Sequence, residues 1–419
     1  MRSKKVVVIG QGYVGLPLAV RAVEVGHTVT GIDVDARRAA ALASGVSYVE
    51  DISSARLGAV RGTGRYEVAS DYESLVGWNV AVITVPTPLH ESRPDLRFVE
   101  DACRSIAASL RPGCLVVLES TTFPGTTEEL VVPLLEQGSG LRAGDDFLVG
   151  YSPERIDPGN ARWGFANTPK VVSGVDDRSR EAVEEFYGTL VETVVPVSGT
   201  REAELTKLLE NTFRHVNIAL VNELAVFADE LGVDVWETIR AASTKPFGFM
   251  PFTPGPGVGG HCLPVDPSYL SWQVRRKLGR TFRFIELAND VNEHMPDHVV
   301  AKLATMLNDE GKSVRGARVA LVGLAYKKNS GDVRESPSMR IAHLLLEMGA
   351  DLVGIDPHVE GHRWPSSVER RDALPASLTD CDLAVLLTDH DDVDLRMLDG
   401  VPTFDTRHVM PTGPDVRVL

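Results

Sequence analysis

Short apolar runs alternate with helix-like patterns over the first part of the chain, from residue 4 to about residue 195. These runs are rich in Val, Ile and Leu and lie at residues 6–9, 29–32, 80–85, 114–118, 147–149 and 171–172. Strands that alternate with helices form a parallel sheet with helices on both faces. The pattern therefore predicts an α/β domain in this part of the chain.

A long helical pattern follows at residues 200–231. Glu202 and Glu204 lie in its first turn, where the helix dipole favours anions, and Gly232 stands at the expected end. A helix of about 30 residues is about 45 Å long, and such a rod commonly joins two domains and carries a subunit interface. Further helical patterns at residues 236–242, 269–277 and 284–307 predict a helical middle region.

A second sheet-like pattern begins at residue 314 and echoes the first. A strand, a glycine turn and a helix lead to residues 350–356, another strand that ends in an acid, Asp356. The predicted fold is α/β, with two Rossmann-like doubly wound domains joined by a central long helix and a helical dimerisation domain. We place the three domains at residues 1–198, 199–310 and 311–419.

The chain has 419 residues, more than one hydrophobic core usually supports, so several domains are expected. It is 43% hydrophobic and 24% charged, which is ordinary for a soluble globular protein. No apolar run reaches the roughly 18 residues that span a bilayer, and the N-terminus leads directly into a strand, so we expect a cytoplasmic protein. The four cysteines, at positions 103, 114, 262 and 381, lack paired or metal-type spacing, and no metal site is predicted. The net charge of −15 argues against a nucleic-acid partner.

The N-terminal strand leads into a dinucleotide fingerprint, G-x-G-x-x-G, at Gly10, Gly12 and Gly15. The second strand then ends in Asp33, at the interval expected for a carboxylate that bonds ribose hydroxyls. Because a carboxylate repels a 2′-phosphate, the pattern favours NAD over NADP, although Arg37 and Arg38 lie nearby. We expect further cofactor contacts from Tyr13, Val14 and Arg38, and from residues at later strand ends, Thr87 and Thr121.

Candidate chemistry lies in a glycine-rich segment at residues 255–269, which contains Cys262 and, four residues later, Asp266. A thiol beside glycines is a candidate nucleophile, because backbone N–H groups approach a ligand closely there. A small buried cysteine after a turn is the alternative interpretation. Lys207 and Asn211, spaced i, i+4, share one face of the long helix. They suit an oxyanion at a reacting carbonyl, whereas on an exposed helix they would be an ordinary solvated pair.

Six motifs follow one another along the chain, at residues 10–15, 119–122, 152–155, 207–212, 259–266 and 325–337. In these motifs and their order the chain resembles the UDP-glucose/GDP-mannose dehydrogenases, which are NAD-dependent nucleotide-sugar 6-dehydrogenases, over nearly its whole length. It implies a four-electron oxidation of a sugar C6 alcohol to a carboxylate with two NAD molecules in succession. A homodimer or higher homo-oligomer is implied as well.

The same resemblance assigns roles to individual residues. Cys262 matches the nucleophile that holds the aldehyde as a thiohemiacetal and then as a thioester, and Lys207 and Asn211 match the oxyanion-stabilising pair. Asp266 and Thr121 match the groups that order the catalytic water, and Glu154 matches the general base of thioester hydrolysis. Arg334 is expected to contact the cofactor. Substrate contacts are expected from Glu154, Arg155, Lys207, Asn211, Gly257, Gly259 and Lys327.

The substrate is predicted from the segment before the cysteine, where no arginine lies between Arg240 and Cys262. Aromatic and proline residues stand there instead, and the segment is similar to the subgroup that oxidises UDP-N-acetylhexosamines. We expect UDP-N-acetylglucosamine, with UDP-glucose or TDP-glucose as alternatives. Two other classes stay open: a two-electron 3-hydroxyacid-type dehydrogenase, which needs no covalent step, and a non-catalytic sensor of nucleotide sugars.

Overall fold

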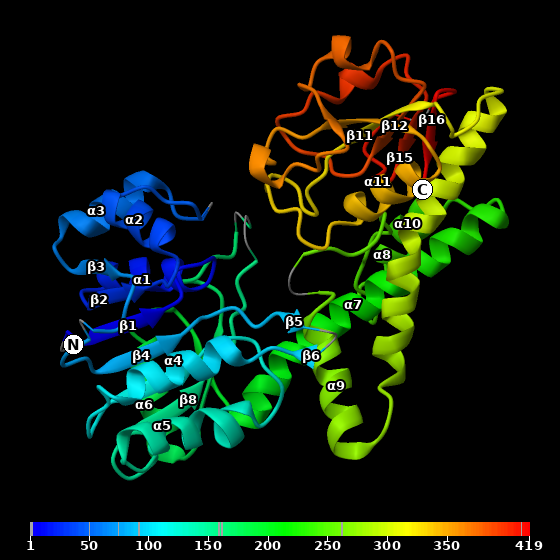
Figure 1. The fold of residues 1–419 in the computed structure, drawn as a ribbon. Helices are drawn as coiled ribbons and strands as arrows, with labels where there is room; N and C mark the ends of the chain where they lie inside the picture. The colour runs from blue at the N-terminus through cyan, green and yellow to red at the C-terminus, as the bar shows by residue number, and fades with distance from the viewer. Residues whose placement is uncertain are drawn as a thin grey trace. The chain divides into compact units, whose positions relative to one another are not determined.

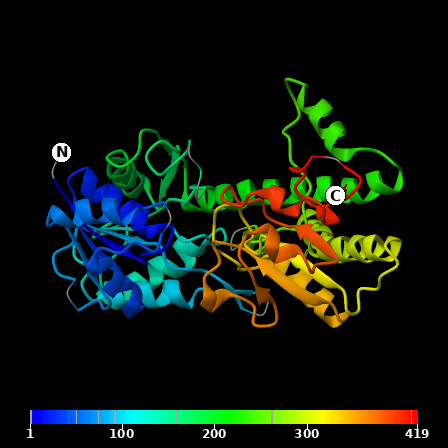
Figure 2. The ribbon, with the colours of Figure 1, turned by 90° about the horizontal axis from the view of Figure 1, so that it is seen from above.

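The computed structural model describes residues 3–49, 51–73, 75–90, 93–157, 160, 162–260, 263–411 and 413–419. The chain forms two compact units, Met1–Glu210 and Asn211–Leu419. Their boundary falls within α7 (Thr200–Glu230), a continuous helix of 31 residues that agrees with the predicted helix at 200–231 (Figures 1 and 2). The division into three domains stays a prediction.

The first unit contains an eight-stranded sheet in the order β10-β9-β8-β7-β4-β1-β2-β3. Neighbouring strands are parallel except β8 and β9, which are antiparallel. The strands are β1 (Lys5–Ile9), β2 (Thr28–Ile32), β3 (Tyr66–Ala69), β4 (Val80–Ile83), β7 (Leu115–Leu118), β8 (Leu148–Tyr151), β9 (Lys170–Gly174) and β10 (Val194–Pro196). A two-stranded hairpin, β5 (Leu89–His90) and β6 (Arg93–Pro94), stands apart from this sheet.

Residues that alternate along the strands build two separate cores, one on each face of this sheet. Val6 and Val8 of β1 belong to one cluster, and Val7 and Ile9 belong to the other. Helices on both faces were predicted and are confirmed: α1 and α6 contribute to the first cluster, and α4 and α5 to the second. The helices are α1 (Gly15–Glu24), α2 (Ala36–Ser44), α3 (Ser54–Gly62), α4 (Arg97–Ala107), η1 (Thr127–Val131), α5 (Val132–Ser139) and α6 (Asp177–Tyr187).

Helices dominate the first half of the second unit. After α7 come α8 (Val235–Ser243), α9 (Asp266–Leu278) and α10 (Arg283–Asp309), close to the predicted helical patterns. Trp236 on α8 donates from its indole N–H to the carbonyl of Leu419 at 2.7 Å, so the end of the chain is tied to the helical region.

The second unit also contains a six-stranded, fully parallel sheet in the order β13-β12-β11-β14-β15-β16. This is the same spatial order, 3-2-1-4-5-6, as the six strands from β3 to β8 of the first sheet. The elements are β11 (Arg318–Val322), α11 (Pro337–Glu347), β12 (Asp351–Ile355), η2 (Gly361–Arg363), β13 (Glu369–Arg370), η3 (Pro375–Leu378), β14 (Leu383–Leu386), η4 (Leu395–Leu398), β15 (Thr403–Asp405) and β16 (Val416–Val418). The predicted internal echo is therefore confirmed. Within the described residues, no helix is long and apolar enough to cross a membrane.

Candidate active site

The turn between β1 and α1 has the geometry of a phosphate-binding loop. Gly10 has φ of +95°, and a Cβ there would lie 2.7 Å from the Thr84 carbonyl oxygen. A Cβ on Gly15 would lie only 1.8 Å from the Gly10 carbonyl oxygen, whereas a Cβ on Gly12 would meet nothing within 4 Å. The first and third glycines are thus required by packing, and the second faces open space at the start of α1. This arrangement fits the pyrophosphate of a dinucleotide.

Asp33, just beyond β2, is fixed beside this loop. Its two carboxylate oxygens accept hydrogen bonds from the backbone N–H groups of Gln11, at 3.1 Å, and Asp35, at 3.0 Å. The Gln11 carbonyl in turn accepts from the Tyr48 hydroxyl at 2.7 Å. Because these bonds leave other lone pairs of the carboxylate available, Asp33 fits the ribose-binding role predicted for it.

Three further predicted cofactor residues, Tyr13, Val14 and Arg38, follow Gly10 in the chain. Tyr13 packs against the first core cluster, and Val14 caps the start of α1 without a side-chain hydrogen bond. The Arg38 guanidinium lies over the Tyr48 ring, 5.6 Å from its centroid. Arg37 is held by Asp35 at 3.1 Å, and this hydrogen-bonded pairing lowers the pKa of Asp35 to about 2.

Two predicted threonines meet at adjacent strand ends. The Thr87 hydroxyl, beyond β4, donates to the carbonyl of Thr121, beyond β7, at 2.9 Å. β4 and β7 are neighbours in the sheet, so the carboxyl ends of both strands open on the same edge. The structure thus brings these two residues together near the switch point of the sheet.

Glu154 lies beyond β8, the next strand, and is 9% exposed. One of its oxygens accepts from the backbone N–H groups of Arg155 and Ile156. The neighbouring Arg155 is engaged elsewhere, since its guanidinium pairs with Glu210 at 2.7 Å and donates to the Pro169 carbonyl at 2.6 Å.

Behind Glu154 lies a buried lysine that the sequence analysis did not identify. Lys170, on β9, is 4% exposed and pairs with Glu119 at 2.5 Å and with Glu154 at 3.6 Å. Burial, followed by the charge of Glu154, raises the pKa of Glu119. Burial disfavours the Lys170 ammonium, but the two carboxylates outweigh it and raise the pKa of Lys170.

The start of α7 is anchored to the loop that carries Thr121. The Glu204 carboxylate accepts from the Gly125 N–H at 2.6 Å and from the Thr127 N–H and hydroxyl at 2.8 and 2.7 Å. Burial raises the pKa of Glu204 to about 7. Lys207, one turn further along α7, is 9% exposed.

In the second unit, two predicted catalytic residues are in direct contact. The Asn211 side-chain amide donates to the Asp266 carboxylate at 2.5 Å. Asp266 is the first residue of α9 and is 3% exposed. The fold thus brings into contact two residues that are 55 positions apart in the chain.

Cys262 lies outside the described residues, but its glycine-rich lead-in is well defined. Gly257 and Gly260 have φ of +134° and +86°, a conformation that favours glycine. A Cβ on Gly259 would lie 2.7 Å from the Tyr326 side chain, and the Gly260 N–H donates to the Arg334 carbonyl at 3.1 Å. The lead-in thus packs against the loop that carries Lys327 and Arg334.

In that loop, the Arg334 guanidinium is bound to the Asp332 carboxylate by hydrogen bonds of 2.5 and 2.9 Å. Lys327 is half-buried in the same loop.

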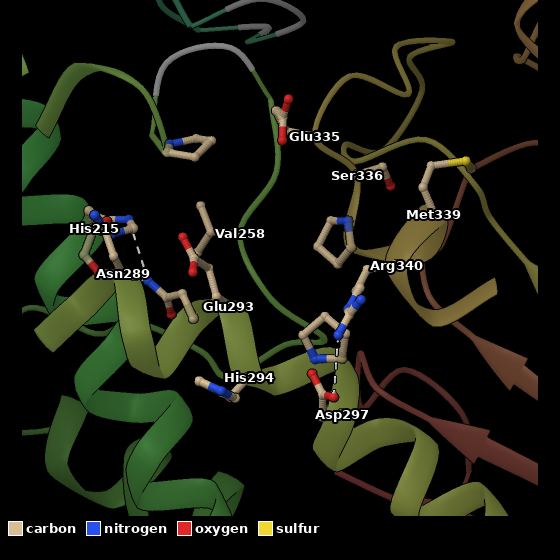
Figure 3. Close-up of a pocket in the computed structure, with 14 residues that line it drawn as sticks. His215, Val258, Asn289, Glu293, His294, Asp297, Glu335, Ser336, Met339 and Arg340 are labelled. Carbon is tan, nitrogen blue, oxygen red and sulfur yellow. Dashed lines mark hydrogen bonds and ion pairs between the residues drawn. The ribbon is translucent and has the colours of Figure 1, made fainter. Parts of the chain in front are cut away.

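A cavity of about 580 Å³ adjoins the glycine-rich segment and is lined by Val258 and Pro264. Figure 3 shows it between α10 and the start of α11, where Arg340 points toward Asp297 and pairs with it at 3.7 Å. Polar residues His215, Asn289 and Asn292 also line this cavity. His215 bonds Asn289, Asn222 donates to Asn292, and the Gly255 N–H donates to Asn222. Through these bonds α7 and α10 hold the glycine-rich segment in place.

Asp356, at the end of β12, corresponds in position to Asp33 but differs in its contacts. Its oxygens accept from the N–H groups of Leu324, Ala325, His358 and Val359, and from the ring of His390 at 3.1 Å. Five donors use up the acceptor capacity of a carboxylate. Asp356 therefore lacks the available lone pairs with which Asp33 fits a ribose.

Comparison with known proteins gives three consecutive family matches. The NAD binding domain of the UDP-glucose/GDP-mannose dehydrogenase family matches residues 4–191, its central domain matches residues 201–294, and its UDP binding domain matches residues 320–412.

Individual relatives match over most of their length. The chain is 36% identical to the UDP-N-acetyl-D-mannosamine dehydrogenase of Pyrococcus horikoshii, over 92% of this chain and 89% of the relative. It is 39% identical to the UDP-N-acetyl-D-glucosamine 6-dehydrogenase of Pseudomonas aeruginosa, over 86% and 84%. A solved structure of UDP-D-ManNAc dehydrogenase from Pyrococcus horikoshii superposes with a TM-score of 0.90 at 34% identity and covers 99% of this chain and 98% of its own.

Proposed function

This chain belongs to the UDP-glucose/GDP-mannose dehydrogenase family, and from that premise we propose that it oxidises the C6 alcohol of a UDP-N-acetylhexosamine to the carboxylate. NAD is the cofactor of the family's first domain, and it accepts a hydride from the substrate carbon when bound. The overall reaction consumes the alcohol, two NAD⁺ and water, and yields the carboxylate, two NADH and three protons.

The observation that carries this proposal is the hydrogen bond between Asn211 and Asp266. Its donor comes from α7 and its acceptor from the start of α9, four residues after Cys262 in the chain. A single amide thus stands next to the carboxylate that follows the proposed nucleophile. This contact supports a site that holds a carbonyl oxygen and a water together, as acyl chemistry requires.

In the proposed mechanism the chain's own residues handle the carbonyl and the protons. The Cys262 thiolate adds to the C6 aldehyde, so the aldehyde stays bound until it is oxidised to the thioester. Lys207 and Asn211 stabilise the oxyanion that forms at that carbon. Asp266 and the Thr121 hydroxyl orient the water that attacks the thioester. Glu154 accepts a proton from this water as the carbon–sulfur bond breaks and the thiolate leaves.

Substrate contacts are proposed on both sides of the glycine-rich segment. Gly257 and Gly259 place the backbone close to the loop that carries Lys327, so a sugar nucleotide bound along this segment would meet that cation. Arg334 is held by Asp332, and its backbone carbonyl receives the Gly260 N–H. We propose that Arg334 and Arg155 act mainly by fixing the loops around the site, with cofactor and substrate contacts through their exposed edges.

The N-acetyl sugar is proposed from the lead-in to Cys262, where aromatic and proline residues occupy the positions between Arg240 and the cysteine. The names of the relatives from Pyrococcus and Pseudomonas support the same class. UDP-N-acetylglucosamine is our first choice, and UDP-N-acetylmannosamine is the second, because relatives of both names match nearly the whole chain.

A substrate panel tests both levels of the proposal. UDP-N-acetylglucosamine, UDP-N-acetylmannosamine, UDP-glucose, TDP-glucose and GDP-mannose are assayed for NADH release, and NADH is counted per sugar consumed. We expect two NADH per sugar and the highest kcat/KM for an N-acetyl sugar. A higher kcat/KM for a glucose nucleotide would refute the substrate assignment, and one NADH per sugar would refute the four-electron reaction.

We also propose a symmetric homodimer, formed with a second copy of this chain through α7. Apolar side chains along one face of this helix are exposed, at Phe213, Leu220, Leu224 and Phe227, and the exposed Leu231 follows directly after its end. At 3.6 residues per turn they form one stripe, and Asn211, His215 and Asn222 lie on the opposite face. An apolar stripe of this length on one helix matches the self-complementary surface of a two-fold interface.

A further inference from the structure

Three charged side chains are buried together at the edge of the proposed site, and the mechanism above uses only one of them. Glu119 is 1% exposed, Lys170 is 4% exposed and Glu154 is 9% exposed. The Lys170 ammonium is 2.5 Å from Glu119, 3.6 Å from Glu154 and 3.1 Å from the Pro153 carbonyl oxygen that accepts its hydrogen bond. Burial of charged side chains costs desolvation free energy, so a cluster of this kind calls for a functional explanation.

The antiparallel pairing of β8 and β9 explains how the lysine reaches this place. Gly150 pairs with Gly174, and Tyr151 pairs with Ser173. Continued by three residues, this register sets position 154 opposite position 170. The Ser152 hydroxyl, which donates to the Val171 carbonyl at 2.7 Å, keeps the two segments together past the last strand pair. A parallel β9 would place Lys170 at the opposite edge of the sheet.

The surroundings of the cluster show that its charges act mainly on one another. The Tyr187 hydroxyl on α6 donates to Glu119 at 2.7 Å, and the Lys170 ammonium lies over the rings of Phe165 and Tyr187, at 5.8 and 5.3 Å. Arg155, the other nearby cation, is paired with Glu210 on α7.

Tyr151 at the end of β8 is fully buried. Within the described residues, one oxygen of Glu119 and one of Glu154 accept no hydrogen bond.

We propose that Lys170 and Glu119 are positioning residues that set the proton affinity of Glu154: Lys170 holds the Glu154 carboxylate ionised, and Glu119 limits the effect of Lys170. This proposal rests on the proposed role of Glu154 as the base of thioester hydrolysis. The Lys170 ammonium lies between the two carboxyl groups, so it attracts the proposed base while Glu119 opposes that attraction.

The two positioning residues have opposite predicted effects, and this makes the proposal testable. Lys170→Met removes the cation that favours the Glu154 carboxylate, so the acid limb of the hydrolytic step shifts to higher pH, by about one to three units. Glu119→Gln removes a like charge, so the same limb shifts to lower pH, by up to about one unit. Lys170→Arg keeps the charge and is expected to restore the wild-type limb to within about half a unit.

The experiment follows the decay of the thioester after the burst of NADH, by rapid quench at each pH. The burst rate and the substrate KM serve as internal controls, because Lys170 and Glu119 are expected to leave binding and hydride transfer unchanged. Opposite shifts of the acid limb, with recovery in the Lys170→Arg variant, support the proposal. Shifts in the same direction, or no shift in either variant, overturn it.

Two further measurements separate this inference from the proposed function. If Glu154→Gln leaves the hydrolytic step and its acid limb intact, or if the wild type yields one NADH per sugar, the proposed function and this inference both fail. If those two results hold and only the Lys170 and Glu119 variants show no shift, this inference alone fails. Glu119→Gln changes the size of the side chain little, so its shift is a sufficient test if Lys170→Met does not fold.

Discussion

Substitution of alanine at two glycines of the β1–α1 turn separates folding from cofactor binding. A Cβ on Gly12 would meet nothing within 4 Å, so Gly12→Ala should change the stability of the free protein by less than about 0.5 kcal/mol. A Cβ on Gly15 would lie 1.8 Å from the Gly10 carbonyl oxygen and 2.5 Å from the Thr84 hydroxyl. Because backbone must move to relieve these clashes, Gly15→Ala should cost about 1–3 kcal/mol.

The assay is thermal unfolding with and without NAD. For a unit of this size, each kcal/mol corresponds to about 2–4 °C in Tm, so Gly15→Ala should melt roughly 2–12 °C below the wild type without cofactor. Gly12→Ala should melt with the wild type when NAD is absent. Its methyl group would stand where the pyrophosphate approaches, and we expect a tenfold or greater loss of NAD affinity, about 1.4 kcal/mol. At an NAD concentration of about 100 times the wild-type Kd, the stabilisation by NAD should fall from about 2.7 to about 1.4 kcal/mol.

Two results would refute this reasoning. A Gly12→Ala protein stabilised by NAD as strongly as the wild type would show that the phosphate does not pass over this glycine. A Gly15→Ala protein that melts with the wild type would show that close packing of α1 on β1 is not what requires glycine there.

Three further predictions concern the nucleophile, the start of α7 and the dimer. Cys262→Ser should lower turnover more than tenfold, which corresponds to an increase of the activation free energy by more than about 1.4 kcal/mol. NAD binding, measured by calorimetry, should stay nearly unchanged. Retention of more than about a tenth of the wild-type rate would exclude the thiol as nucleophile. Burial raises the pKa of Glu204 from its ordinary value of 4.5 to about 7. Between pH 4.5 and pH 7 the folded state therefore binds more protons than the unfolded state. The contribution of Glu204 to the free energy of unfolding falls as pH rises through this range. The difference in unfolding free energy between Glu204→Gln and the wild type should therefore move by roughly 3 kcal/mol in favour of the variant from pH 4.5 to pH 7, and a difference independent of pH would contradict the assignment. The double variant Leu224→Asp, Phe227→Asp should sediment as a monomer of about 45.4 kDa at micromolar concentration, whereas the wild type should sediment as a dimer. A wild type that already sediments as the monomer would exclude the dimer.

Much of the fold follows from apolar periodicity, because central strands are buried on both faces and read as continuous apolar runs. β1, β4 and β7 are of this kind. The edge strands β3 and β10 were not predicted, since both are short and partly exposed and their side chains carry a weak apolar signal. The antiparallel direction of β9 relative to β8 could also not be predicted, because apolar periodicity indicates that a strand exists but not its direction in the sheet.

The predicted site residues that meet in the structure are those placed by regular elements. Thr87 and Thr121 follow neighbouring parallel strands, and such strand ends share one edge of the sheet. The contact between Asn211 and Asp266 was not predicted, because no local pattern links residues that far apart. The family resemblance gave each of the two a role but no contact between them. Lys170 was missed for a related reason: one lysine at the start of an apolar run is an ordinary strand end. Its importance comes from the register with β8, which no local pattern shows.

The carboxylate of Asp356 shows how a protein can close a site that its fold would otherwise offer. In the first sheet, the acid after the second strand keeps lone pairs for a sugar, while in the second sheet His390 and four backbone amides occupy the equivalent oxygens. The protein's own donors thus occupy the oxygens that a sugar would need. To make a ribose site at this strand end, removal of the His390 ring would have to come before the addition of any new contact.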